Sequence, residues 1–166
     1  LLSRAHINLL EFLASMICIW LDIIDGDVSP ESCFLSMGDN TSATGWLKRT
    51  NFQPANEKDF DTTAKTSLAR HLARLVQKSE SMIYSQWFPG DDNDVSDSLS
   101  RDHHLSDIQL IHMLSSLVPS QLTHNFRIVE LPPEIKSWVF SLLDKLPVKP
   151  QRQVRHKISV LATSFA

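Results

Sequence analysis

Glycine and cysteine are both scarce in this chain of 166 residues. Only four residues are glycine, whereas Leu, Ser and Ala are frequent, and this composition favours helices. The two cysteines, Cys18 and Cys33, lie in apolar runs and do not have a CxxC spacing. The sequence therefore argues against a disulfide framework and against a cysteine-based structural zinc site, and it favours a reducing compartment.

The chain also lacks a long uninterrupted apolar run. The longest apolar stretch, residues 9–24, contains Glu11 and Asp22 and is shorter than the ~20 residues that cross a bilayer. It has neither the basic start nor the small-residue cleavage site of a signal peptide. We therefore expect no membrane partner and an intracellular location, in the cytoplasm or the nucleus. Because the sequence begins Leu1-Leu2-Ser3 without Met, we expect it to be an internal piece of a longer protein.

Neither sign of charge dominates, since the net charge of -3 excludes a wholly basic nucleic-acid coat. The distribution is nevertheless uneven. Residues 1–47 and 91–107 are acidic, whereas residues 48–80 and the end of the chain from Lys145 are basic. A metal site needs clustered acids, but solvated loops have the same composition.

Hydrophobic spacing predicts an α/β arrangement for the first two thirds of the chain. Helices are expected at residues 5–24, 41–49, 59–78 and 94–101, a buried strand at residues 33–37 and a second strand at residues 82–88. The core-facing stripe of the first helix is expected to contain Leu9, Leu10, Leu13, Ile17, Trp20, Leu21 and Ile24. Asp39 or Thr41 is expected to cap the second helix, and Asn93 the last one. This order of elements predicts parallel strands with flanking helices.

The remaining third differs in pattern. Helices are expected at residues 106–117 and 133–146, with a short strand at residues 126–131 between them. The sequence after Pro147 is basic and interrupted by proline, and we expect it to be disordered. The predicted organisation is one α/β domain over residues 1–104, a mainly helical extension over residues 105–146 and a tail over residues 147–166.

Three acids fall where these elements would bring them together. Glu11 lies on the polar stripe of the first helix, Asp39 follows the first strand, and Asp97 lies on the short helix after the second strand. Sites form at the carboxyl ends of parallel strands, and converging carboxylates bind the Mg²⁺ pairs that hydrolyse phosphodiesters. Each acid alone also has an ordinary structural explanation: a solvated helix face, a helix cap, and an ion pair between Asp97 and Arg101.

Three sequence segments resemble one known family. Ile7-Asn8-Leu9-Leu10-Glu11-Phe12-Leu13-Ala14 resembles the family pattern IN-x-LE-x-x-A, and the segment from Gly38 to Ala43 resembles TDN-x-x-A. The segment from Gln86 to Arg101, which reads QWFPGDDNDVSDSLSR, resembles the longer pattern W-x-PG-x-x-N-x-x-AD-x-LSR. The family is the ribonuclease H domain of retrotransposon reverse transcriptase polyproteins, of gypsy-like or DIRS-like elements. The resemblance covers residues 5–104.

The resemblance implies a partial ribonuclease H-like fold whose opening β-hairpin is missing. It implies that the intact domain hydrolyses RNA in RNA–DNA hybrids with Mg²⁺ (or Mn²⁺), as part of a protein with an upstream polymerase region. Glu11, Asp39 and Asp97 match the second, third and fourth catalytic, metal-binding carboxylates of the family. Asn8 matches a position that touches the hybrid near the scissile phosphate, and Asn40, beside Asp39, could do likewise.

Two departures from the family pattern affect this expectation. The first catalytic Asp of the family precedes the helix, and the six residues before Ile7 do not supply it, so we expect this chain alone to be nearly inactive. Ser96 replaces the Ala that normally precedes the last acid. The rival interpretations are a non-catalytic nucleic-acid-binding or connection module decayed from such an element, and an unrelated helical scaffold. His103 and His104 could reach the site or simply be exposed.

A row of basic residues marks the helix expected at residues 59–78. Arg70, Arg74 and Lys78 are spaced by four and therefore share one face. They could follow a phosphate backbone, and a solvated helix face explains them equally well.

Overall fold

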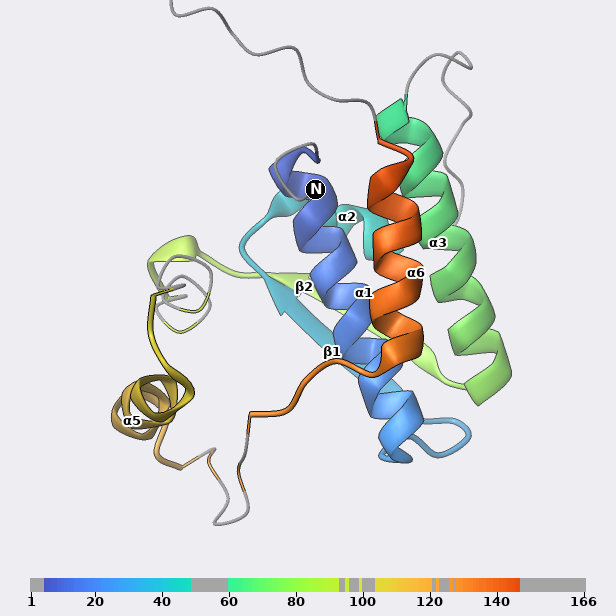
Figure 1. Ribbon diagram of the computed structural model, residues 1–166. Coiled ribbons are helices and arrows are strands. Elements are labelled where there is room, and N and C mark those ends of the chain that lie inside the picture. Colours follow the sequence, from blue (N-terminus) through green and yellow to red (C-terminus); the bar gives the residue numbers. More distant parts are fainter. Residues whose placement is uncertain are drawn as a thin grey trace, which may run out of the picture.

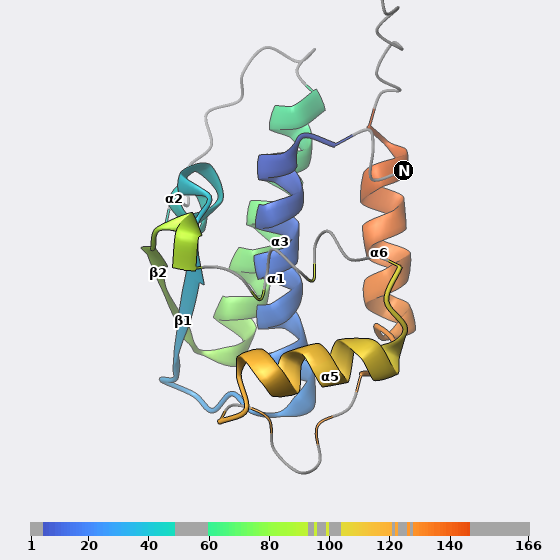
Figure 2. The same cartoon turned by 90° about the vertical axis from the view of Figure 1, so that its left-hand side faces the viewer.

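The computed structural model describes residues 5–48, 60–92, 104–120 and 128–146, with single positions 95, 99, 122 and 126. These residues form a mixed α/β structure with a two-stranded parallel sheet and five α-helices. Figure 2 shows three layers: the sheet with α2, then α1 and α3, then α6. The α/β class and the parallel strands expected from the sequence are confirmed.

Helix α1 (Ile7–Asp25) is the centre of this arrangement. His6 caps its first turn, and Gly26 ends it with a φ of 78°, the left-handed conformation that glycine adopts without a Cβ penalty. The buried side chains of α1 are Leu9, Phe12, Leu13, Met16, Ile19 and Trp20. The expected stripe was therefore wrong in part, since Ile24 is exposed and three other residues are buried instead. The reason is that α1 is covered on more than one side (Figure 1).

The sheet consists of β1 (Cys33–Gly38) and β2 (Met82–Trp87), close to the predicted strands. Leu35 pairs with Tyr84, so the two strands are adjacent and in register over their whole length. The expectation that the first strand is buried was wrong, because the side chains of β1 alternate between exposed and partly buried positions, and those of β2 follow a similar pattern. Helices cover one face of the sheet, whereas Leu35, Met37, Met82 and Tyr84 are exposed on the other.

Two further helices connect β1 to β2. Helix α2 (Thr41–Lys48) begins directly after β1, and α3 (Phe60–Ser79) runs beside α1 (Figure 1). The buried side chains of α3 include Ala64, Leu68 and Leu72, which are spaced by four and therefore share one helix face. These helices match the predicted ones in type and position.

Helix α6 (Pro133–Asp144) forms the third layer and lies within the helix predicted at residues 133–146. Its Ile135, Leu142 and Leu143 join the same core as α1 and α3. Helix α6 therefore belongs to the main body, although the predicted organisation separated residues 105–146 as an extension.

Helix α5 (Asp107–Leu117) lies beside this body and begins with a capping box between Ser106 and Gln109. Leu114 is its one buried residue. The strand expected at residues 126–131 is wrong, because the described positions there (126 and 128–131) have no strand structure. The tail from residue 147, the Asn93 cap and most of the helix expected at residues 94–101 lie outside the described residues.

Helix α1 has the length and apolar composition of a membrane span. Length and apolar composition are weak evidence for a membrane span, because the core helix of a globular domain shares them. Helix α1 supplies much of this core.

Candidate functional site

The candidate site lies where both strands end, beside the first turns of α1 and α2 (Figure 1). Asp39 is the first residue after β1, and Asn40 precedes α2. The Asn40 Oδ1 accepts hydrogen bonds from the backbone N–H groups of Ser42 and Ala43, both at 3.0 Å. Asn40 is therefore the N-cap of α2, and the predicted caps, Asp39 and Thr41, were wrong. Because Asn40 satisfies the helix end, the Asp39 carboxylate is not needed for capping.

A side-chain hydrogen bond joins this segment to α1. The Asn40 Nδ2 donates to the Asn8 Oδ1 at 3.0 Å, and both residues are partly buried. The two asparagines that were predicted from separate motifs are thus in direct contact. The Asn8 oxygen accepts this bond, and its amide nitrogen is the group of this side chain that can donate hydrogen bonds.

Glu11 lies on the same polar stripe of α1, three residues after Asn8, which places it on the same helix face. Its side chain is partly buried. The contact between Asn8 and Asn40 brings this face of α1 to the segment that carries Asp39. The described residues therefore join the elements that carry two of the three predicted carboxylates.

The loop after β2 closes against Asp39. The Trp87 Nε1 donates to the Asp39 carbonyl oxygen at 2.8 Å, and the Phe88 N–H donates to the Gly38 carbonyl oxygen at 3.2 Å. A Cβ added to Gly90 would lie 3.3 Å from the Asp39 Oδ2. The backbone at Gly90 thus approaches the Asp39 carboxylate closely, which a larger side chain would hinder.

Asp97, the third predicted carboxylate, lies outside the described residues, as do Arg101 and His103. His104 is described and exposed. Within the described part of the chain, no group of three His, Cys, Asp or Glu side chains is arranged to hold a metal ion. The chemistry of the described donors nevertheless fits Mg²⁺, which prefers carboxylate and amide oxygens.

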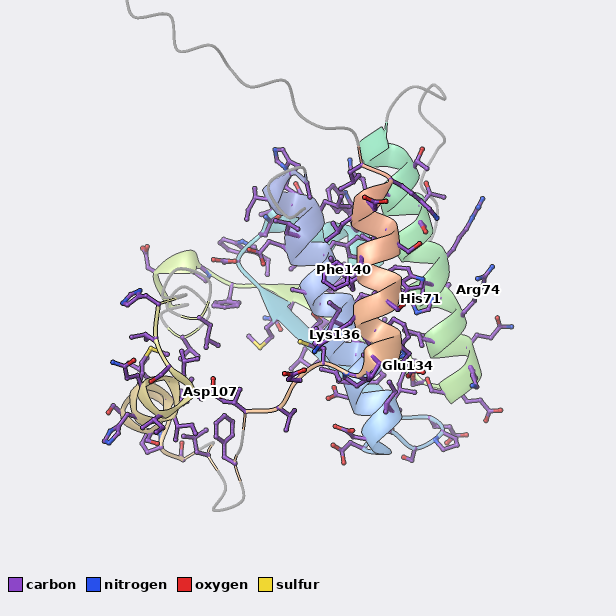
Figure 3. The ribbon with its side chains drawn as sticks, viewed as in Figure 1. His71, Arg74, Asp107, Glu134, Lys136 and Phe140 are labelled. Atoms are coloured by element: carbon purple, nitrogen blue, oxygen red, sulfur yellow. The ribbon has the colours of Figure 1, made fainter. Side chains whose placement is uncertain are left out.

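The basic residues Arg70, Arg74 and Lys78 are exposed along α3. Figure 3 shows Arg74 on the side of α3 that faces away from α1, not next to the strand ends. The structure therefore separates this basic face (Arg70, Arg74 and Lys78) from the candidate site.

Two ionisable groups at the other end of α1 have shifted pKa values. Burial raises the pKa of the Asp22 carboxyl, and the neighbouring Asp27 and Asp25 carboxylates raise it further. Burial and the nearby Asp22 also raise the pKa of the Cys18 thiol. Because Asp22 lies near the carboxyl end of α1, its charge also opposes the helix dipole.

Sequence reasoning missed the contributions of Trp87 and Gly90. Both residues belong to the QWFPG segment. That segment was compared with the family pattern as a whole, and no role was assigned to either residue. The contact with Asp39 could not be predicted, because it depends on how the loop folds back over the end of β1. No known protein family, curated protein or solved structure matches this chain.

Proposed function

We propose that this chain is the ribonuclease H-like part of a retroelement reverse transcriptase. In intact form this part hydrolyses the RNA strand of RNA–DNA hybrids. The observation that carries the proposal is the hydrogen bond between Asn8 and Asn40. It joins two segments whose sequences separately resemble the family, and it places them at the carboxyl ends of parallel strands. This is where active sites form in parallel α/β structures.

In this proposal Glu11, Asp39 and Asp97 hold Mg²⁺ or Mn²⁺. The bound ions supply activation of a water molecule and stabilisation of the leaving oxygen. Asn8 donates hydrogen bonds from its amide nitrogen to the hybrid, and Asn40 fixes the orientation of Asn8. Trp87 holds the backbone of Asp39, so that the carboxylate keeps its direction. Selectivity for the hybrid comes from the 2′-hydroxyl groups of the RNA strand.

A second candidate function is nucleic-acid binding without catalysis, as a module decayed from such an element. The exposed basic face on α3 favours it, since Arg70, Arg74 and Lys78 can contact phosphates independently of the carboxylates. Such contacts carry no information about the sequence or the sugar.

Binding of fluorescent 20-base-pair duplexes distinguishes a hybrid-specific contact by Asn8 from phosphate contacts by the basic face of α3. We expect the chain to prefer an RNA–DNA hybrid to duplex DNA when Mg²⁺ is present. The substitution Asn8→Ala should reduce that preference. In contrast, Arg74→Ala should weaken binding to both duplexes equally and lower the salt slope by about one unit. Equal affinity of the wild-type chain for both duplexes, unchanged by Asn8→Ala, would support the non-catalytic function.

Cleavage of the same hybrid tests catalysis. We expect weak cleavage that requires Mg²⁺, because the residues supply three of the four carboxylates that the resemblance implies. Asp39→Asn should abolish it, whereas Asp107→Asn on α5 should leave it unchanged. Cleavage that persists in Asp39→Asn would come from a contaminant or another site and would contradict the proposal.

A further inference from the structure

His71 forms a cluster of three aromatic rings with two tryptophans from two other helices. Its ring centroid lies 4.3 Å from that of Trp20 on α1 and 4.5 Å from that of Trp138 on α6, where the rings are stacked. The two indoles also contact each other edge to face at 5.9 Å. Figure 3 shows His71 between α3 and α6. The imidazole is thus the aromatic link between α3 and the outermost helix.

One nitrogen of this ring is isolated from water. The His71 Nε2 is buried and has no hydrogen-bond partner among the described residues. The neutral tautomer with its proton on Nδ1 leaves only a lone pair at Nε2. Protonation places an N–H group there without an acceptor, and it places a charge in the partly buried cluster beside the two indoles. The docked arrangement therefore fits the neutral imidazole better than the imidazolium.

The basic residues on α3 also disfavour the imidazolium of His71. On its own helix, Arg70, Arg74 and Lys78 are all positive, and burial followed by Arg74 lowers the pKa of the His71 imidazole. On α6, Glu134 lies one turn before Trp138 and is exposed. On α1, Asp22 and Asp25 project from other faces than Trp20, since they lie two and five residues away. Cation–π attraction to the indoles favours the imidazolium, whereas burial and the Arg74 charge favour the neutral ring and lower its pKa.

We propose that His71 makes the docking of α6 dependent on pH. The neutral ring stacks on Trp138, contacts Trp20 at a tilt and holds α6 against α1 and α3, and protonation weakens these contacts. The buried side chains of Ile135, Leu142 and Leu143 still contribute apolar docking at every pH. Acidification therefore increases the fraction of molecules in which α6 is detached, without unfolding the sheet.

The direction of the effect follows from linkage between docking and protonation. A histidine whose pKa is lowered by docking stabilises the docked state fully above its ordinary value of about 6.5. That contribution is lost as the pH falls below this value and through the lowered pKa. Each unit of lowering corresponds to about a tenfold change in the docking equilibrium.

Amide hydrogen exchange on the full chain, followed by mass spectrometry, tests the proposal. Protection of residues 133–144 is measured at pH 7.5 and at pH 5.5 and corrected for the intrinsic exchange rate. We expect protection in α6 to fall at the lower pH while β1 and β2 keep theirs. The substitution His71→Phe preserves an aromatic ring of similar size and should remove the pH dependence. His112→Gln, on the exposed side of α5, should behave like the wild-type chain.

A second variant covers the case in which His71→Phe does not fold. Arg74→Gln removes the positive charge that disfavours the imidazolium, so less protection of α6 should be lost at pH 5.5. Unchanged wild-type protection of α6 between the two pH values would overturn the proposal. It would equally be overturned by the same loss of protection in His71→Phe, because carboxylates would then be the cause.

Discussion

The Asn40 Nδ2 donates a hydrogen bond to the Asn8 Oδ1 at 3.0 Å, although the two residues lie 32 positions apart. The same Asn40 side chain caps α2 through its Oδ1. One amide therefore orients two helices, both of which begin beside the carboxyl end of β1. Any ligand of this corner meets a preformed arrangement, because neither asparagine needs to reorganise.

A double-mutant cycle measures this link. Asn40→Ser keeps a capping oxygen but removes the donor, and Asn8→Ala removes the acceptor. We expect a coupling energy of about 0.5–1.5 kcal/mol between the two substitutions, the range of one neutral hydrogen bond. Urea unfolding gives the four free energies. Additive effects would show that the bond contributes nothing to stability.

Removal of the Trp87 indole donor should lower stability through the lost hydrogen bond to the Asp39 backbone. Trp87→Phe keeps an aromatic ring but loses the hydrogen bond to the Asp39 carbonyl oxygen. We expect a loss of about 0.5–1.5 kcal/mol in the free energy of unfolding. Tyr84→Phe on the same strand is the matched control, because the Tyr84 side chain is exposed and should tolerate the change. Equal effects of the two substitutions would argue against the assigned bond.

The position of the core can be tested at Phe12, which was absent from the predicted stripe. Phe12 is fully buried and contacts Trp46 edge to face at a centroid distance of 5.8 Å. Phe12→Ala should cost about 3–5 kcal/mol in the free energy of unfolding. Leu35→Ala on the exposed sheet face should cost less than about 0.5 kcal/mol. Thermal or urea unfolding of both variants checks the contrast, and similar costs would contradict the observed burial.

The carboxyl end of α1 should be stabilised by loss of negative charge. Because the Asp22 pKa is raised in the folded state, its charge destabilises folding at neutral pH, and acid removes this effect as the pH falls toward 3.8. Asp22→Asn should therefore raise the free energy of unfolding by about 0.3–1 kcal/mol at pH 7 and by progressively less at lower pH. Asp107→Asn should have the opposite sign, because Asp107 lies in the first turn of α5. Denaturant unfolding between pH 4 and pH 7 distinguishes these outcomes.

Much of this fold could be predicted because local patterns determined it. Apolar spacing and stop signals such as Gly26 placed α1, α3, α6 and both strands within a few residues. The exposed face of the sheet was not predictable, since Leu35 and Tyr84 are as apolar as buried strand residues. Burial there depends on which face the helices cover, and that is a property of the tertiary arrangement.

The candidate site was predictable in its residues but not in its contacts. Asn8 and Asn40 were identified from motifs, and their hydrogen bond emerged only in the folded chain. The α2 cap was misassigned because Asp39, Asn40 and Thr41 are all good capping residues in sequence. Tertiary contacts determine which residue is the cap: Asn40 is held by its hydrogen bond to Asn8, and the Asp39 carboxylate lies close to Gly90.

The proposed function requires Glu11, Asp39 and Asp97 to form one metal site. Titration of the full chain with Mn²⁺, followed by electron paramagnetic resonance, measures whether they do. Loss of a residue that merely orients a metal ligand lowers affinity about 10–100-fold, so Glu11→Gln, Asp39→Asn and Asp97→Asn should each weaken Mn²⁺ binding by at least about tenfold. Asp107→Asn should leave the affinity unchanged. Unaltered Mn²⁺ affinity in the three variants, or an equal loss in Asp107→Asn, would contradict the claim.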